Sequence, residues 1–323
     1  MEQTRNVTAD WTWFKQLFGQ IQSNIERVIQ GKSHEIRLAL VTLVAEGHLL
    51  IEDVPGVGKT MLAKAVARSF GCSFRRIQFT PDLLPTDITG VNVFNQERGD
   101  FEFKPGAVFA NIVLGDEINR ASPKTQSALL ESMEERQVTV DGESYQLGVP
   151  FVVIATQNPI EHEGTYPLPE AQLDRFMMRL AIGYPAAEAE AEILATHGHA
   201  STLEDIGPVT DAGGAGRMIA MAREVYVADA LRRYIVELAE ATRRHPDVYL
   251  GASPRASIML LRAARALAAS DGRDYVVPDD IKALTLPVLT HRLIVSADAA
   301  MSGRSAQTIL GDALDEVPVP VTG

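Results

Sequence analysis

The chain has 323 residues, more than the roughly 250–300 at which a single hydrophobic core stops growing, so two domains are expected. Hydrophobic residues make up 46% of the chain and charged residues 22%, proportions that exclude wholesale disorder. The formal net charge is -12 and the sequence has no long run of Lys or Arg, which argues against a protein that binds nucleic-acid phosphates or anionic membranes.

The N-terminal residues and the cysteine content predict a cytoplasmic protein. The opening residues, MEQTRNVTADWTWFKQ, contain no apolar core of a signal peptide. The longest apolar stretch, Ala39–Ala45, is interrupted by Thr42 and falls far short of the ~20 residues that span a bilayer. Cys72 is the single cysteine, so an internal disulfide is impossible and a reducing compartment fits. We therefore expect no direct membrane insertion.

The first half of the chain has the pattern of an α/β domain. Apolar residues at helical spacing predict helices at 11–30 and 33–46. Short apolar runs follow at 48–51, 74–79, 110–115, 151–155 and 178–182, and helical segments such as 59–70 and 122–136 separate several of them. Short buried strands that alternate with helices indicate a five-stranded parallel sheet covered by helices on both faces.

Two β-hairpins are predicted within this half. The stretch between Pro81 and Phe109 is rich in turn residues and has a candidate hairpin turn at 97–100. Residues 136–149 carry Asp141-Gly142, a strong signal for a hairpin turn.

The second half of the chain is mainly helical. Helices are predicted at 186–197, about 214–224, 228–244, 254–270 and 278–286, with a loose connector at 201–216. The tail, which ends in VPVPVTG, is expected to fray. The predicted organisation is an α/β core at 1–185, a small all-helical domain at 186–303 and a flexible tail at 304–323.

A phosphate-binding loop is predicted between the strand at 48–52 and the following helix. Gly56 and Gly58 let backbone N–H groups turn towards the phosphates, and Lys59 neutralises phosphate charge. Thr60 offers its hydroxyl to Mg²⁺. The residues expected to bind ATP are Pro55, Gly56, Val57, Gly58, Lys59, Thr60 and Met61.

Asp53 stands where the usual G-x-x-x-x-G-K-[ST] pattern has its first glycine. We expect a solvent-facing carboxylate there. Its replacement by glycine should change ATP affinity by at most a few-fold, because such a charge is typically worth less than about 1 kcal/mol. Two roles stay open at this point: the carboxylate weakens nucleotide affinity, or it pairs with a nearby arginine at little cost.

Acidic and amide side chains follow two other predicted strands. Asp116 and Glu117 end a buried apolar run, which places them at the carboxyl edge of the sheet, where open α/β sheets bind ligands. Asp116 is expected to hold Mg²⁺ through water, and Glu117 to polarise the attacking water. Asn158 ends the next strand and can hydrogen-bond the γ-phosphate or that water.

These elements in this order resemble an AAA+ ATPase, and long blocks of the chain resemble the MoxR family. The similar blocks are DVPGVGKT (53–60), FTPDLLPTDITG (79–90), GDEINRASPKTQSALLESMEERQVTV (115–140), ATQNPIEHEGTYPLPEAQLDRFM (155–177) and GASPRA (251–256). The resemblance covers about residues 20–295. It implies an AAA+ P-loop core followed by a helical lid domain.

The resemblance also implies roles for residues that position in the chain alone would not give. Asn158 matches the sensor-1 position, and Arg175 matches the arginine finger, which in such rings enters the ATP site of the neighbouring subunit. Arg255 matches sensor 2, which reaches from the lid to the phosphates. Arg120 is a weaker match to an interface arginine. Residues 88–107 correspond to the helix-2 insert, and 136–149 to the hairpin before sensor 1.

The function implied is an ATPase that remodels or matures partner proteins. The family resemblance implies a hexameric ring, a protein client and a von Willebrand A-domain partner, in some cases for metal insertion. Two alternatives stay open: a helicase-like nucleic-acid motor, disfavoured by the acidic net charge, and a chelatase-type motor subunit. His162, His197 and His199 lack the spacing of a metal site.

Overall fold

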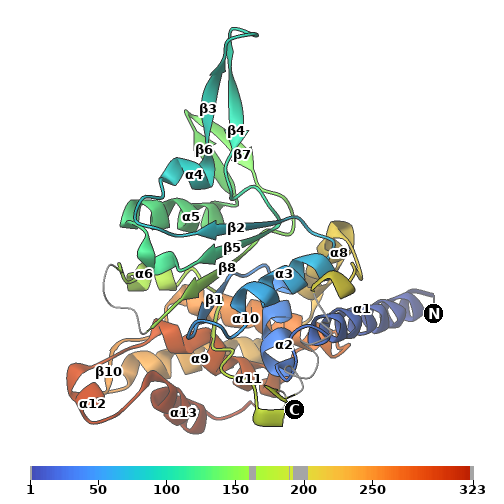
Figure 1. Cartoon of the computed structure of the whole chain (residues 1–323). Coiled ribbons are helices and arrows are strands. Elements are labelled where there is room, and N and C mark those ends of the chain that lie inside the picture. Colours follow the sequence, from blue (N-terminus) through green and yellow to red (C-terminus); the bar gives the residue numbers. More distant parts are fainter. Residues whose placement is uncertain (1, 160–164, 189, 192–202, 321–323) are drawn as a thin grey trace.

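The computed structural model describes residues 2–159, 165–188, 190–191 and 203–320. Its centre is a five-stranded parallel sheet with the strand order β2-β5-β8-β1-β9 (Figure 1). The strands are β1 (Leu49–Glu52), β2 (Phe74–Gln78), β5 (Ile112–Asp116), β8 (Val152–Gln157) and β9 (Met178–Leu180). The predicted α/β core with a five-stranded parallel sheet is confirmed.

The sheet separates two hydrophobic clusters. Successive side chains of a strand point to opposite faces, and in β1 Leu49 and Ile51 enter one cluster while Leu50 enters the other. β5 and β8 alternate in the same way. Because both faces are covered, the strands read as continuous apolar runs, which is why the sequence signal was clear.

One face of the sheet is covered by N-terminal helices together with the helical second half of the chain. These helices are α1 (Glu2–Glu26), α2 (Ser33–Val44), α3 (Lys59–Ser69) and α10 (Pro254–Ser270). Their buried side chains form one continuous cluster across the predicted boundary at residue 185. The opposite face is covered by α4 (Pro85–Thr89) and α5 (Pro123–Glu135). The first helix begins earlier and ends earlier than the predicted 11–30.

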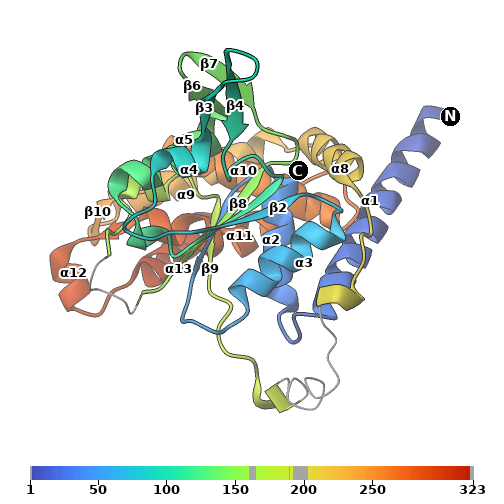
Figure 2. The same ribbon diagram turned by 45° about the horizontal axis from the view of Figure 1, so that its top comes forward.

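Both predicted hairpins are present, as β3 (Gly90–Asn95) with β4 (Asp100–Pro105) and β6 (Gln137–Val140) with β7 (Glu143–Gln146). The β6–β7 turn is Asp141-Gly142, both with positive φ. The hairpins stand side by side beyond α4 and α5 (Figure 2). Phe103 and Tyr145 stack at 3.9 Å between ring centroids, so the hairpins form one projecting unit.

The described residues of the second half are mainly helical and include a two-stranded ladder of β10 (Val248–Leu250) and β11 (Ile294–Val295). Its other helices are α8 (Ala212–Glu224), α9 (Asp229–Arg244), α11 (Pro278–Leu289), α12 (Ala297–Met301) and α13 (Ala306–Glu316), with short α6 (Glu170–Leu173) preceding β9 in the core. The predicted helix at 186–197 and connector at 201–216 fall partly outside the described residues.

The prediction of a flexible tail from residue 304 is wrong for most of that segment. Residues 306–316 form α13, whose Ile309, Leu310 and Ala313 are buried against α9 and α11. Arg304 anchors the helix start through an ion pair with Asp247 at 3.0 Å. The apolar residues at helical spacing in this segment form a helix, and the proline-rich end begins only after it. Within the part of the chain that the structure describes, no helix combines the length and apolar content needed to cross a membrane.

His48 sits just before β1 and is buried in its neutral form. Its Nε2–H donates to the Met133 carbonyl at 3.0 Å, while its Nδ1 accepts the N–H of Val153 at 3.0 Å. Burial, assisted by the charges of nearby arginines, lowers the pKa of His48 to about 4. A proton on Nδ1 would also face an N–H donor, so the folded protein resists protonation there.

We expect acid to destabilise the protein through His48. His48 binds a proton near pH 6.5 in the unfolded chain and only near pH 4 in the folded chain. The contribution of His48 to the free energy of unfolding is therefore fully present above pH 6.5 and is lost as the pH falls towards 4. Between pH 7 and pH 5 this loss is about 2 kcal/mol. Urea unfolding measures it, and His48→Gln, whose amide can make both hydrogen bonds without titrating, should flatten the pH dependence. An identical slope in both proteins would contradict the assignment.

Candidate active site

The phosphate loop lies at the carboxyl edge of the sheet, between β1 and α3. Gly56 and Gly58 have φ values of 88° and 92°, a region that side-chain-bearing residues rarely adopt. Gly58 directly precedes α3, so the free N–H groups of the first turn face the loop. Lys59 Nζ donates to the carbonyls of Asp53, at 2.5 Å, and Val54, at 3.1 Å. The ammonium is therefore held inside the curve of the loop.

Asp53 is not the solvent-facing acid that we expected. The residue is only 8% exposed. Its Oδ1 accepts the N–H of Val54 at 2.8 Å, and its Oδ2 accepts the N–H of Gly183 at 2.6 Å. The carboxylate therefore ties the start of the loop to the chain that leaves β9, and the expectation of an energetically minor surface charge is wrong.

Asp116 ends β5 at the same edge of the sheet and is 8% exposed. Thr156 Oγ1 donates to its Oδ1 at 2.5 Å, and the Arg76 guanidinium pairs with its Oδ2 at 2.5 Å. Both carboxylate oxygens thus have direct protein partners. A contact to a metal through an intervening water fits this arrangement better than direct ligation.

Glu117 is placed by a left-handed backbone conformation, with φ of 57°. Its N–H donates to Thr156 Oγ1 at 2.9 Å, and its Oε2 accepts from Gln78 Nε2 at 2.8 Å and Arg120 NH1 at 2.9 Å. The carboxylate is therefore aimed by β2 on one side and by the following turn on the other. Arg120, suggested as an interface arginine, pairs with Glu117 within the subunit.

Asn158 directly follows β8, which lies between β5 and β1 in the sheet. It is 7% exposed. This position places the amide between the acids of β5 and the phosphate loop, at the same edge. Lys59, Thr60, Asp116, Glu117 and Asn158 thus all lie at or just beyond the carboxyl ends of the neighbouring strands β1, β5 and β8.

The oxygen groups at this edge fit a magnesium ion that is bound chiefly by phosphate. Mg²⁺ in phosphate sites takes one or two protein oxygens and fills its octahedron with phosphate oxygens and water. Thr60 and Asp116 supply a hydroxyl and a carboxylate of this kind. Across residues 2–159, 165–188, 190–191 and 203–320, no group of three His, Cys, Asp or Glu residues could hold a metal by itself. His162, His197 and His199 lie outside these residues.

Arg175 and Arg255 lie at the opposite edge of the sheet. Arg175 precedes β9, where Met177 pairs with His48 before β1. Arg255, in the first turn of α10, forms an ion pair with Glu134, and Arg175 pairs with the same carboxylate at 3.1 Å. The length of β1, about 13 Å, separates this edge from the loop. Within one subunit the structure does not bring either arginine to the phosphate loop.

The two arginines line a cavity of about 300 Å³ with a positive balance of charge. Its charged residues are Glu46, Glu134, Arg136, Arg175, Arg255 and Arg262. Glu46 is 8% exposed and forms ion pairs with Arg136 and Arg223. Burial opposes ionisation of Glu46, but these arginines outweigh it, so the pKa of its carboxyl is lowered. This edge therefore presents arginines that an anion could engage.

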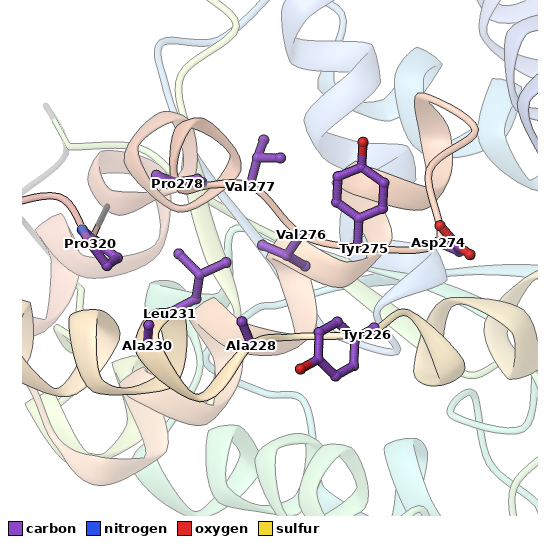
Figure 3. A pocket seen from close by; sticks show the side chains of 10 residues that line it. All are labelled: Tyr226, Ala228, Ala230, Leu231, Asp274, Tyr275, Val276, Val277, Pro278 and Pro320. Carbon is purple, nitrogen blue, oxygen red and sulfur yellow. The ribbon is translucent and has the colours of Figure 1, made fainter. Parts of the chain in front are cut away.

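A second cavity, of about 500 Å³, lies among the helices of the second half (Figure 3). Tyr226, Leu231, Val276 and other apolar side chains line it, and Asp274 is the single charged residue among the ten that line it. A cavity without a cation and with a carboxylate at its rim does not suit a polyphosphate. This cavity is therefore separate from the nucleotide site.

Several contacts at the nucleotide edge were absent from the sequence interpretation. Arg76 and Gln78 come from β2, and Thr156 precedes Asn158 by two residues. The polar positions at the exposed end of β2 were a usable signal, but only the strand order places β2 beside β5. Glu134, which holds Arg175 and Arg255, lies at the far end of α5 and had no local signal.

Comparisons with known proteins agree with this geometry. Family models match for the ATPase family associated with various cellular activities (AAA) at residues 48–178 and for the AAA lid domain at 240–313. The uncharacterised YeaC of Bacillus subtilis is 50% identical, over 94% of this chain and 95% of its own. Chaperone MoxR1 of Mycobacterium tuberculosis is 44% identical, over 92% and 80%.

Two further relatives are likewise similar over nearly the whole chain. Protein MoxR of Paracoccus denitrificans is 32% identical, over 94% of this chain and 96% of its own. A crystal structure from Cytophaga hutchinsonii, described as a candidate ATPase, is 37% identical with a TM-score of 0.92, covering 99% of this chain and all of that one. These relatives therefore share both the α/β core and the helical second half with this chain.

Proposed function

The chain belongs to the MoxR family of AAA ATPases, and we propose that it hydrolyses ATP between the subunits of a hexameric ring to remodel partner proteins. The observation that carries this proposal is the position of Arg175 and Arg255. Both lie at the edge of the sheet opposite the phosphate loop, and both form an ion pair with the carboxylate of Glu134. Arginines placed there serve an ATP only if it belongs to a neighbouring subunit, so hydrolysis depends on assembly.

Each residue of the nucleotide edge has a step in this mechanism. The N–H groups of 56–60 hold the phosphates, and Lys59 exchanges its loop carbonyls for phosphate oxygens. Thr60 and Asp116 would hold a magnesium ion, which would supply positive charge that neutralises the phosphates. Glu117 accepts a proton from water as the water oxygen bonds to the γ-phosphorus. The bond from that phosphorus to the bridging oxygen breaks, and ADP leaves.

The neighbouring subunit completes the site. Its Arg175 and Arg255 guanidinium groups add positive charge next to the oxygens of the transferred phosphoryl group, where charge builds up in the transition state. Asn158 orients the attacking water or the γ-phosphate from within the subunit. Glu134, which now holds both arginines, must release at least part of its contact when they engage phosphate.

The paired hairpins are the surface that we assign to the client protein. Phe94 and Phe101 face each other across β3–β4 with ring centroids 5.4 Å apart, and they are 51% and 71% exposed. Exposed aromatic pairs on a projecting unit suit transient contact with apolar segments of another protein. The name of MoxR1 as a chaperone supports this role. A von Willebrand A-domain partner and metal insertion belong to the same proposal.

A trapping experiment tests the client-binding role. Glu117→Gln protein, incubated with ATP in native cell extract, should retain client proteins, and adding Phe94→Ser with Phe101→Ser should remove most of them. Tyr249→Ser in the lid, on β10 and even more exposed than the two phenylalanines, is the matched control and should retain the same proteins. Equal retention by the hairpin variant would refute the assignment of this surface. Mass spectrometry identifies and quantifies the retained proteins.

A further inference from the structure

The segment from Asp174 to Gly183 contains β9, the outermost strand of the sheet. It connects the end of the sheet where Arg175 lies to the end where the phosphate loop lies. Arg175 stands near its start, and β9 forms its middle. The lid holds the start through Arg292, whose guanidinium donates to Asp174 Oδ1 at 2.7 Å and to the Phe176 carbonyl at 2.6 Å. The Arg292 side chain is 1% exposed. The lid therefore supplies one of two anchors of this segment, and the other lies at its far end.

Asp53 of the phosphate loop holds the other end. Its Oδ2 accepts the Gly183 N–H at 2.6 Å, while Lys32 Nζ donates to the carbonyls of Ile182 and, at 2.9 Å, Tyr184. Gly183 has φ of 67°, so the chain turns sharply where these contacts grip it. A carboxylate and an ammonium thus fix three successive residues from two sides.

The Asp53 contact has little to do with phosphate itself. The N–H groups that face a phosphate come from residues 56–60, whereas both carboxylate oxygens of Asp53 are used on Val54 and Gly183. A hydrogen bond to a charged acceptor is among the stronger kinds, and a buried N–H left without one is costly. A glycine at position 53, the residue of the usual pattern, cannot make this link.

We propose that Asp53 is a positioning residue that fastens the phosphate loop to the exit of β9 and thereby sets the position of Arg175 at the start of the same segment. The inference rests on the proposed function in one respect, that Arg175 serves the ATP of a neighbouring subunit. In each subunit, β9 then connects the phosphate loop of that subunit's own ATP site to Arg175, which acts in the ATP site of the neighbouring subunit.

Hydrogen exchange at Gly183 tests the link directly and requires no ring. Asp53→Gly should speed exchange of the Gly183 amide at least about fivefold, because its buried acceptor is gone. Asp53→Asn, which keeps one acceptor oxygen, should fall between the two. Glu52→Gln is the matched control, since Glu52 is adjacent and also contacts β9, through Arg179 at 2.9 Å. Unchanged exchange in Asp53→Gly would overturn the proposal.

Mixed rings test the consequence for catalysis. Asp53→Gly should bind ATP within about threefold of wild type, since residues 56–60 remain, but lose at least about tenfold in kcat. Mixed with Lys59→Ala it should regain activity, because its intact ATP site then meets a well-placed Arg175 from the neighbour. Mixed with Arg175→Ala it should regain none. The reverse pattern would place the defect in its own ATP site and overturn the proposal.

Failure of the ring proposal would look different. If Lys59→Ala and Arg175→Ala do not restore each other, the arginines do not act between subunits. The exchange rate of Gly183 still decides whether Asp53 holds the exit of β9. If Asp53→Gly does not fold, Asp53→Asn supplies both measurements with the same signs and smaller size.

Discussion

Glu117→Gln is expected to bind ATP and assemble like wild type while its ATP turnover falls at least about 100-fold. General bases contribute about 10²–10⁴ in rate, and the amide cannot accept the proton of the attacking water. The substitution keeps size, and the amide oxygen can still accept from Gln78 and Arg120, which hold the carboxylate at 2.8 and 2.9 Å. The loss should therefore appear in kcat rather than in ATP affinity.

Phosphate release and nucleotide binding, measured on the same preparations, check this expectation. Glu135→Gln is the matched control, because Glu135 is an exposed acid at the end of α5. The control should hydrolyse ATP at the wild-type rate. Wild-type-like turnover in Glu117→Gln would show that another group activates the water. Loss of ATP binding would instead mean that the charge at 117 supports the site's structure.

The sheet and the phosphate loop were predictable because their signals are local. Each strand is a short apolar run, and the buried strands β1, β5 and β8 carry apolar side chains into both clusters. Gly56, Gly58 and Lys59 lie within a few residues of one another, between a strand and a helix. A binding loop formed by residues that are close together in the sequence can be predicted without knowing the order of the strands in the sheet.

Contacts between distant segments were not predictable in this way. Gln78 reaches Glu117 only because β2 lies beside β5, and Asp53 reaches Gly183 only because β9 lies beside β1. The expectation of a surface acid at 53 failed for that reason, since the partner is 130 positions along the chain. The missed helix α13 is a different case. Its apolar spacing was present at Ile309, Leu310 and Ala313, but the proline-rich end dominated the interpretation.

Substitution of Arg175 or Arg255 is expected to have the second large effect on ATP turnover. Arg175→Ala should bind ATP normally and lose about 10³-fold or more in kcat, the usual size for an arginine finger supplied by a neighbour. Arg255→Ala should lose turnover in the same direction. Arg232→Ala is the matched control, because Arg232 forms an exposed ion pair with Asp229 on helix α9, and exposed pairs are worth little.

Mixing inactive variants tells whether the two arginines act together on the neighbour. Arg175→Ala and Lys59→Ala, each inactive alone, should recover activity at about a quarter of the interfaces of a random equal mixture. Arg255→Ala should recover with Lys59→Ala in the same way. Arg175→Ala mixed with Arg255→Ala should recover nothing, because every interface then lacks one arginine of the pair that Glu134 holds. Recovery in that last mixture would mean that the two arginines serve different sites, with Arg255 acting within its own subunit after a movement of the lid.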